Sequence, residues 1–192
     1  MTHLSELFTA NAITILRSLE LSQKLENDVH VVPKIYCSWD ATEGTVEVSL
    51  KSLPGRVAEL WGKVSGRPRW LSFNLSLGKS RFHPGDVLGV IFEIEGCADH
   101  EFRPFIRSMI PAGGTADTPL DDTLMGSGDR AVRTLLHTVA RENAIAGEEA
   151  YHTLVLPLQR KDFRLDLRDI RVFVVPAERG LRIGHDTVSG LA

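Results

Sequence analysis

The chain has 192 residues, with 22 basic and 25 acidic side chains, and a formal net charge of −3 when its histidines are neutral. Its apolar content of 43% is ordinary for a globular protein, which excludes disorder as the main state. A slightly acidic chain lacks the basic surface that contact with phosphate backbones requires, so we predict no nucleic-acid partner. No apolar run approaches the roughly 20 residues of a membrane-spanning helix and no signal peptide is evident, so we predict no membrane span and a cytoplasmic location.

Residues 1–28 are predicted to form an N-terminal unit that contains one amphipathic helix, over residues 4–26. Its apolar side chains recur at the three- and four-residue spacings of a helix that buries one face. These side chains are Leu4, Leu7, Phe8, Ile15, Leu16 and Leu19. If the rest of the chain does not cover this face, we expect a second subunit to do so, which predicts a homo-oligomer.

From residue 29 to 176 the hydrophobic period changes to two, which is typical of β-strands. The clearest strand spans 70–77, and others are predicted at 31–39, 45–50, 86–95, 101–110, 151–158 and 170–175. Residues 129–140 fit a helix or a strand, and the surrounding strands favour the strand. Short strands without intervening helices predict a mainly β chain, an antiparallel β-sandwich of jelly-roll type with about eight strands. Residues 111–128 and 141–149 are expected to be long loops, and residues 177–192 a loosely ordered tail.

Residues 86–95 and 101–110 are predicted to pair as a hairpin around Ala98. In that register Glu93 lies opposite Arg103, and Gly89 lies opposite Arg107. One interpretation is a cross-strand charge pair on a solvated face, worth at most about 1 kcal/mol. The other is a ligand-binding face, because guanidinium and carboxylate groups on rigid strands suit oriented hydroxyls or acids, and Phe105 would add a stacking platform.

Two tryptophans, Trp61 and Trp70, flank a short turn-rich segment. Exposed tryptophans at the rim of a sandwich can stack on sugar rings, and the alternative is packing at the rim or in the core. Alternation places Trp70 on the side of Ser72 and Asn74, so it is expected to be the more exposed of the two. The predicted ligand-binding residues are therefore Trp70, Glu93, Arg103, Phe105 and Arg107.

No set of residues makes a convincing catalytic or metal site. The seven histidines lack ligand spacing, and His152 is predicted to be a hydrogen-bonded residue of the sheet. The segment 126–131 matches a dinucleotide-binding loop but lacks a buried strand before it. Cys97, near Asp99 and His100, is placed at a hairpin tip with nothing to hold a reactive geometry.

Glu93 and Glu95 share one strand face, which leaves a glycoside-acting enzyme as a weaker alternative. We predict no catalytic residues, no metal and no cofactor.

Five segments resemble the galactose-binding-like jelly rolls found among carbohydrate-binding modules. They are 70–75, 86–94, 102–108, 153–158 and 167–174, and the resemblance covers roughly residues 30–176 through strand order and a closing Leu-Arg-Asp-Ile step. It implies a ligand on the concave sheet or in loops at one end, and often a structural calcium near a sheet edge. Asp121 and Asp122, or Asp99 and Glu101, match calcium spacing only loosely, so no calcium ligands are predicted.

These observations favour a noncatalytic β-sandwich module that binds a saccharide or a similar polyhydroxylated ligand. The alternative is a protein-interaction or assembly domain that uses the N-terminal helix as its contact element.

Overall fold

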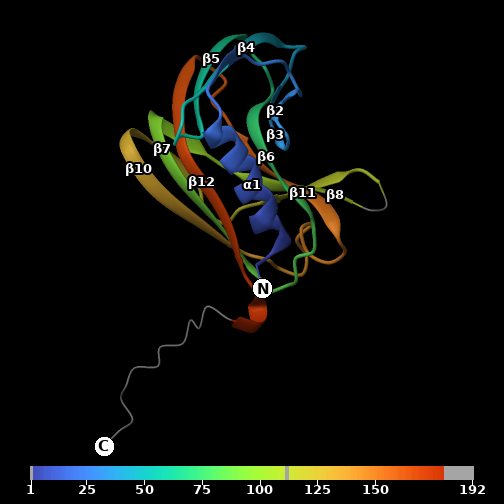
Figure 1. Cartoon of the computed structure of the whole chain (residues 1–192). Helices are drawn as coiled ribbons and strands as arrows, with labels where there is room; N and C mark the ends of the chain where they lie inside the picture. Colours follow the sequence, from blue (N-terminus) through green and yellow to red (C-terminus); the bar gives the residue numbers. More distant parts are fainter. Residues whose placement is uncertain (1, 111–112, 180–192) are drawn as a thin grey trace, which may run out of the picture.

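The chain folds as a sandwich of two antiparallel sheets, which confirms the predicted fold class (Figure 1). The computed structural model describes residues 2–110 and 113–179. The first sheet contains β1 (Leu21–Lys24), β4 (Gly44–Ser52), β5 (Ala58–Gly66), β12 (Phe163–Val175), β7 (Val87–Phe102) and β10 (Leu124–Thr138), in that spatial order. The second sheet contains β2 (His30–Val32), β3 (Ile35–Trp39), β6 (Leu71–Ser80), β11 (Ala150–Pro157), β8 (Phe105–Met109) and β9 (Thr115–Pro119).

The described residues contain twelve strands, against the eight predicted. Four strands account for the difference. β1, β2 and β9 are short and have a weak hydrophobic pattern, and β5 lies in a segment for which no strand is predicted. Most of these lie at or next to the edges of the sheets, where few positions are buried and alternation leaves little trace in the sequence. The predicted loop at 111–128 therefore contains strand residues. Of the predicted tail, residues 177–179 form a short 3-10 helix, and residues 180–192 lie outside the described residues.

The core lies between the inward faces of the two sheets. The apolar positions of the predicted alternating strands are all buried there: Leu71, Phe73, Leu75, Leu88, Val90, Phe92, Leu154, Leu156, Val172 and Val174. Each contributes about 1.5–3 kcal/mol when its side chain leaves water. The period-two pattern therefore identified the inward face of the central strands correctly.

The N-terminal helix α1 (Leu4–Ser18) packs on the sandwich, against β6 of the second sheet and β12 of the first (Figure 1). It ends at Ser18, and the edge strand β1 begins three residues later, so the predicted extent to residue 26 is wrong. Its buried face matches the predicted one only in part. The buried residues are Ser5, Thr9, Ala12, Ile13 and Leu16. Leu16 belongs to the predicted face, and Ile15 and Leu19 of that face are partly buried against the core. Leu4 and Leu7 are about half exposed.

Small polar side chains let the helix approach the sheets closely. The hydroxyls of Ser5 and Ser80 are 2.8 Å apart, the Thr9 hydroxyl donates to the Ser5 carbonyl, and the Ser52 hydroxyl donates to the Leu16 carbonyl. Because these buried polar groups are hydrogen-bonded, their burial carries little cost. A search for apolar periodicity alone overlooks such positions, which explains the error in the helix face.

Strand β7 does not form the predicted hairpin with residues 101–110. It runs through the expected turn, because Gly96 and Cys97 adopt positive φ angles of 104° and 51° and bend the strand without ending it. Its neighbours are β10 and β12, and the chain then crosses at Arg103-Pro104 to β8 in the other sheet. The predicted pairs Glu93–Arg103 and Gly89–Arg107 are therefore wrong. Gly89 pairs instead with Leu136 and Phe173.

Residues 129–138 lie in strand β10, which confirms the strand interpretation. The segment 126–131 forms an irregular part of this strand, with register shifts against β7, and is neither a phosphate-binding loop nor a free turn. The carboxylates of Asp121 and Asp122 accept hydrogen bonds from the outward amides of Thr138 and Leu136. These carboxylates occupy part of an exposed sheet edge, which limits its pairing with other chains.

His152 is fully buried in β11 and hydrogen-bonded, as predicted. Its Nδ1 lies 2.8 Å from the Ser108 hydroxyl and its Nε2 lies 3.2 Å from the Ser80 carbonyl. Burial lowers the pKa of His152 below its ordinary value of 6.5. The unfolded chain therefore takes up a proton that the native protein does not, once the pH falls below about 6.5.

We expect the free energy of unfolding to decrease as the pH falls from about 7 through 6.5 toward the lowered pKa of His152, by no more than about 1.4 kcal/mol per pH unit for this group. Urea unfolding at about pH 7.5 and about pH 5.5 measures the change. His152→Gln should flatten the dependence, whereas His100→Gln, at a less buried histidine, should keep most of it. An unchanged slope in His152→Gln would contradict this account.

Candidate ligand-binding groove

A groove with a cavity volume of about 760 Å³ lies on the outward face of the second sheet. Register places Tyr36, Asn74, Val155 and Phe105 in one row across β3, β6, β11 and β8. The residues one position away on these strands point into the core, so the row faces outward. The volume falls within the range of about 300–1,000 Å³ that is typical of small-ligand sites.

The floor of the groove is polar, although it belongs to the central strand β6. Ser72 and Asn74 are almost fully buried, and the Asn74 side-chain amide donates to the Ser72 hydroxyl at 3.1 Å. The Asn74 amide also lies 3.4 Å from the Tyr36 carbonyl and the Ser72 hydroxyl 3.4 Å from the Ser38 carbonyl, so a ligand would share or replace these contacts. These two residues were not among the predicted binding residues, although the alternation of Ser72 and Asn74 with leucine and phenylalanine was visible in the sequence.

Aromatic side chains form the walls of the groove. Trp70, just before β6, is 47% exposed, and Trp61 on the first sheet is less exposed, as predicted. Phe105 and Tyr36 are half-buried on the opposite walls. The guanidinium of Arg107 lies 5.3 Å from the centre of the Phe105 ring, and that of Arg69 lies 5.5 Å from the Trp70 ring, within the range of cation–π contact.

Asp40 holds the turn that presents Trp70. Its buried carboxylate accepts hydrogen bonds from the amide and hydroxyl of Thr42 and from the amide and Nε of Arg69. The Thr42 hydroxyl, and next the backbone and guanidinium donors, hold the pKa of Asp40 well below its usual range. The Asp40 amide also donates to the Trp70 carbonyl at 3.1 Å. The ionised Asp40 carboxylate thus fixes the backbone of the turn that carries Trp70.

Charged side chains surround the rim. Arg107 makes a two-point contact with Asp117, both distances 2.8 Å, and Arg103 pairs with Glu101. Burial, followed by the nearby charge of Asp28, raises the pKa of Tyr36, so its phenol stays protonated at neutral pH and can donate a hydrogen bond.

Four of the five predicted binding residues meet at this groove: Trp70, Arg103, Phe105 and Arg107. Glu93 does not, because it lies in the part of β7 that pairs with β10 and β12 in the first sheet, whereas only the end of β7, at His100 and Glu101, reaches the groove. The incorrect register did not change the face assigned to Phe105 and Arg107, since both alternate with the buried Ile106 whichever strand they pair with. Whether the four residues bind a ligand stays a prediction.

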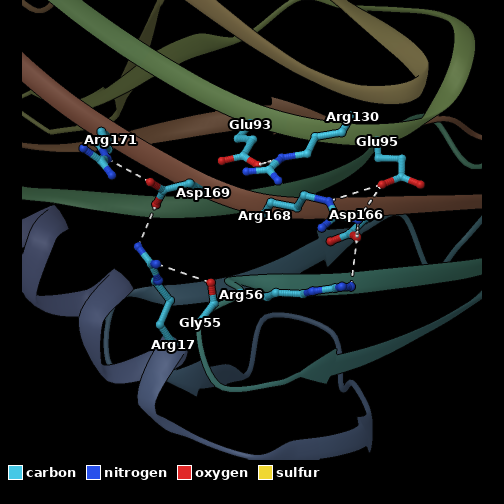
Figure 2. A network of polar contacts seen from close by, with 10 residues as sticks. All are labelled: Arg17, Gly55, Arg56, Glu93, Glu95, Arg130, Asp166, Arg168, Asp169 and Arg171. Atoms are coloured by element: carbon cyan, nitrogen blue, oxygen red, sulfur yellow. Dashed lines mark hydrogen bonds and ion pairs between the residues drawn. The ribbon is translucent and has the colours of Figure 1, made fainter.

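Glu93 belongs to a network of ion pairs on the outer face of the first sheet (Figure 2). Arg130 on β10 pairs with Glu93, and Arg168 on β12 pairs with Glu95 at 2.6 Å. Farther along, Asp169 accepts contacts from Arg17 on α1 and Arg171 on β12. The charge-pair interpretation thus suits Glu93, with Arg130 in place of Arg103.

The described residues do not fit the calcium site that the resemblance implied. Asp121 and Asp122 are engaged with backbone amides. Across residues 2–110 and 113–179, no three histidine, cysteine, aspartate or glutamate side chains gather as metal ligands. Within the same ranges, no helix is long and apolar enough to cross a bilayer.

Neither cysteine has the environment of an activated thiol. Burial raises the pKa of Cys37 to about 12 and that of Cys97 to about 11. Both thiols are therefore protonated at neutral pH, and the thiolate is the reactive form.

Comparison with known proteins gives structural but not sequence relatives. No protein-family model matches the chain, and no curated protein matches it. One similar solved structure is a family 4 carbohydrate-binding module, "CBM4 structure and function", with a TM-score of 0.51, 13% identity, and coverage of 80% of this chain and 95% of that one. Another is the cyclase FisC from Fischerella sp. TAU, solved in complex with an indole compound, with a TM-score of 0.50, 12% identity, and coverage of 86% and 95%.

These similarities show the fold alone, since the identities are low. The chain has the jelly-roll-like β-sandwich fold of carbohydrate-binding modules, as the strand order in its sequence suggested. The same fold also occurs in a cyclase, so the function has to be argued from the groove.

Proposed function

We propose that the protein is a noncatalytic module that binds a saccharide, or a similar polyhydroxylated ligand, in the groove of the second sheet. The observation that supports this most is an exposed Trp70 ring beside a buried floor of Ser72 and Asn74. A sugar ring has an apolar face and a hydroxyl-rich edge, and an aromatic wall with an amide and hydroxyl floor complements both. A structural relative with a similar fold is a carbohydrate-binding module, which agrees with this proposal.

A glycan array followed by calorimetry on the full chain tests the proposal. We expect binding of at least one oligosaccharide at millimolar concentration or below, because the groove is preformed on rigid strands and its aromatic walls are already in place. Absence of binding to every sugar at millimolar concentrations would overturn it.

The glycoside-acting alternative receives no support from its proposed carboxylates. Glu93 and Glu95 lie on the first sheet, outside the groove, and each is engaged by an arginine. A general acid must reach the glycosidic oxygen of a bound sugar, and these groups line no surface of the groove.

Assembly through α1 was predicted for a helix whose apolar face the rest of the chain does not cover. The buried face of α1 packs on the sandwich, so this argument for assembly is weaker. Leu4 and Leu7 remain exposed, and self-association through them stays an untested prediction. Light scattering on the full chain is the appropriate measurement, and a monomer at all concentrations would reject it. Removal of the helix is a poor test, since it would uncover the core.

A further inference from the structure

The end of the groove next to Trp70 carries two arginines. Arg69 directly precedes the tryptophan, and its guanidinium lies over the indole ring. Arg160, which follows β11, donates from one terminal nitrogen to the Arg69 carbonyl at 3.0 Å. A backbone contact thus holds the second guanidinium close to the tryptophan.

The two arginines differ in how their charges are balanced. Arg69 lies 3.0 Å from the Asp40 carboxylate and 3.4 Å from that of Glu43. For Arg160, by contrast, no carboxylate of the described residues lies within ion-pair distance. Arg160 donates to a neutral carbonyl, and its other N–H groups face no carboxylate of the described residues and can bind a ligand.

Carboxylates balance the charges of the other three arginines that line the groove. Arg69 pairs with Asp40 and Glu43, Arg103 with Glu101, and Arg107 with Asp117. Among the described residues, Arg160 is therefore the lining arginine that has no carboxylate partner. The place for an anion is the end of the groove beside Trp70, and not the groove as a whole.

We propose that the groove selects an acidic saccharide, whose ring stacks on Trp70 and whose carboxylate or sulfate is bound by Arg160. This inference rests on the saccharide-binding function proposed above. A guanidinium presents parallel N–H donors that match the two oxygens of a carboxylate, and sulfate offers the same pairing. A neutral sugar would leave the exposed Arg160 charge to water and salt ions alone. The expected preference for an anionic over a neutral sugar therefore comes from the charge of Arg160, which has no carboxylate partner among the described residues.

Four trisaccharide probes test this inference: galacturonic acid, its methyl ester, sulfated galactose and neutral galactose. We expect an anionic probe to bind at least about tenfold more tightly than its neutral counterpart, with the carboxylate and sulfate arms showing which anion is preferred. The advantage should shrink as salt rises from about 0.01 M to about 0.15 M, where the screening length falls from about 30 Å to about 8 Å.

Arg160→Gln supplies the matched variant, because it keeps a hydrogen-bond donor and removes the charge. It should lower affinity for the anionic probe about five- to tenfold and leave the neutral probe unchanged. The control is Arg164→Gln, which removes an arginine 5.9 Å from the Trp61 ring on the first sheet and should alter neither affinity. Unfolding curves confirm that both variants are folded.

Equal binding of the anionic and neutral probes, or wild-type affinity in Arg160→Gln, would overturn the acidic preference while leaving saccharide binding intact. Failure of all four probes and of every sugar on the array would overturn saccharide binding itself, and the preference with it.

Discussion

Replacing Trp70 with alanine is expected to lower the affinity of the groove for its saccharide at least about tenfold, or about 1.4 kcal/mol. The indole ring is 47% exposed at the wall of the groove, so its loss removes a stacking surface rather than a core side chain. Stability should therefore change by less than about 1 kcal/mol. Titration calorimetry and urea unfolding of the same preparation separate the two effects.

Trp61→Ala is the matched control for this variant, because it removes the same side chain from the outer face of the first sheet. Its affinity for the saccharide should equal that of the wild type. If Trp61→Ala lost affinity and Trp70→Ala did not, the ligand would bind to the first sheet. That result would contradict the proposed groove on the second sheet.

The largest effect on stability is expected at the helix. Leu16→Ala should lower the free energy of unfolding by about 2–5 kcal/mol, because this side chain is fully buried against the sandwich and its loss leaves a cavity. Leu7→Ala, on the same helix, should change it by no more than about 0.5 kcal/mol, since Leu7 is 55% exposed. Denaturant unfolding of both variants provides the comparison.

Similar stabilities for these two variants would contradict the placement of α1 as part of the core. A large loss in both variants would instead support the face predicted from the sequence, which contains Leu7 as well as Leu16. The pair thus tests the orientation of the helix directly.

The sequence predicted the class of fold because alternation is strong where a strand is central and one face is buried. Leu71, Phe73 and Leu75 on β6 are an example, since their neighbours are serine and asparagine. The same alternation also placed Ser72 and Asn74, which form the floor of the groove, on the outward face, where polar groups are satisfied by the protein, by water or by a ligand. Ser72 and Asn74 were recognised as an outward face but not as a binding surface.

Strand pairing was less predictable, because alternation states which face a side chain occupies but not which strand lies beside it. A glycine at position 96 is compatible with a hairpin turn and with a bend in a continuous strand. Its ideal Cβ would lie 2.4 Å from the Arg164 carbonyl, so close packing against β12 requires glycine here. That contact exists only in the assembled sheet, and no local pattern reports it.

The misplacement of Glu93 follows from this single error. With a turn at Ala98, β7 and β8 become neighbours, and Glu93 joins Arg103 and Arg107. With a bend at Gly96, the chain changes sheets only at Arg103-Pro104, and Glu93 lies on the opposite side of the sandwich. Phe105 and Arg107 were unaffected, because their direction depends only on the neighbouring buried Ile106.

Mapping amide chemical shifts during a saccharide titration tests the central claim most directly, because it locates the ligand on the protein without any substitution. We predict that the largest shifts fall on β3, β6, β8 and β11 near Tyr36, Trp70 and Phe105, and that the outer face of β7, β10 and β12 stays unchanged. Shifts that cluster around Glu93 and Arg130 on the first sheet would contradict the account.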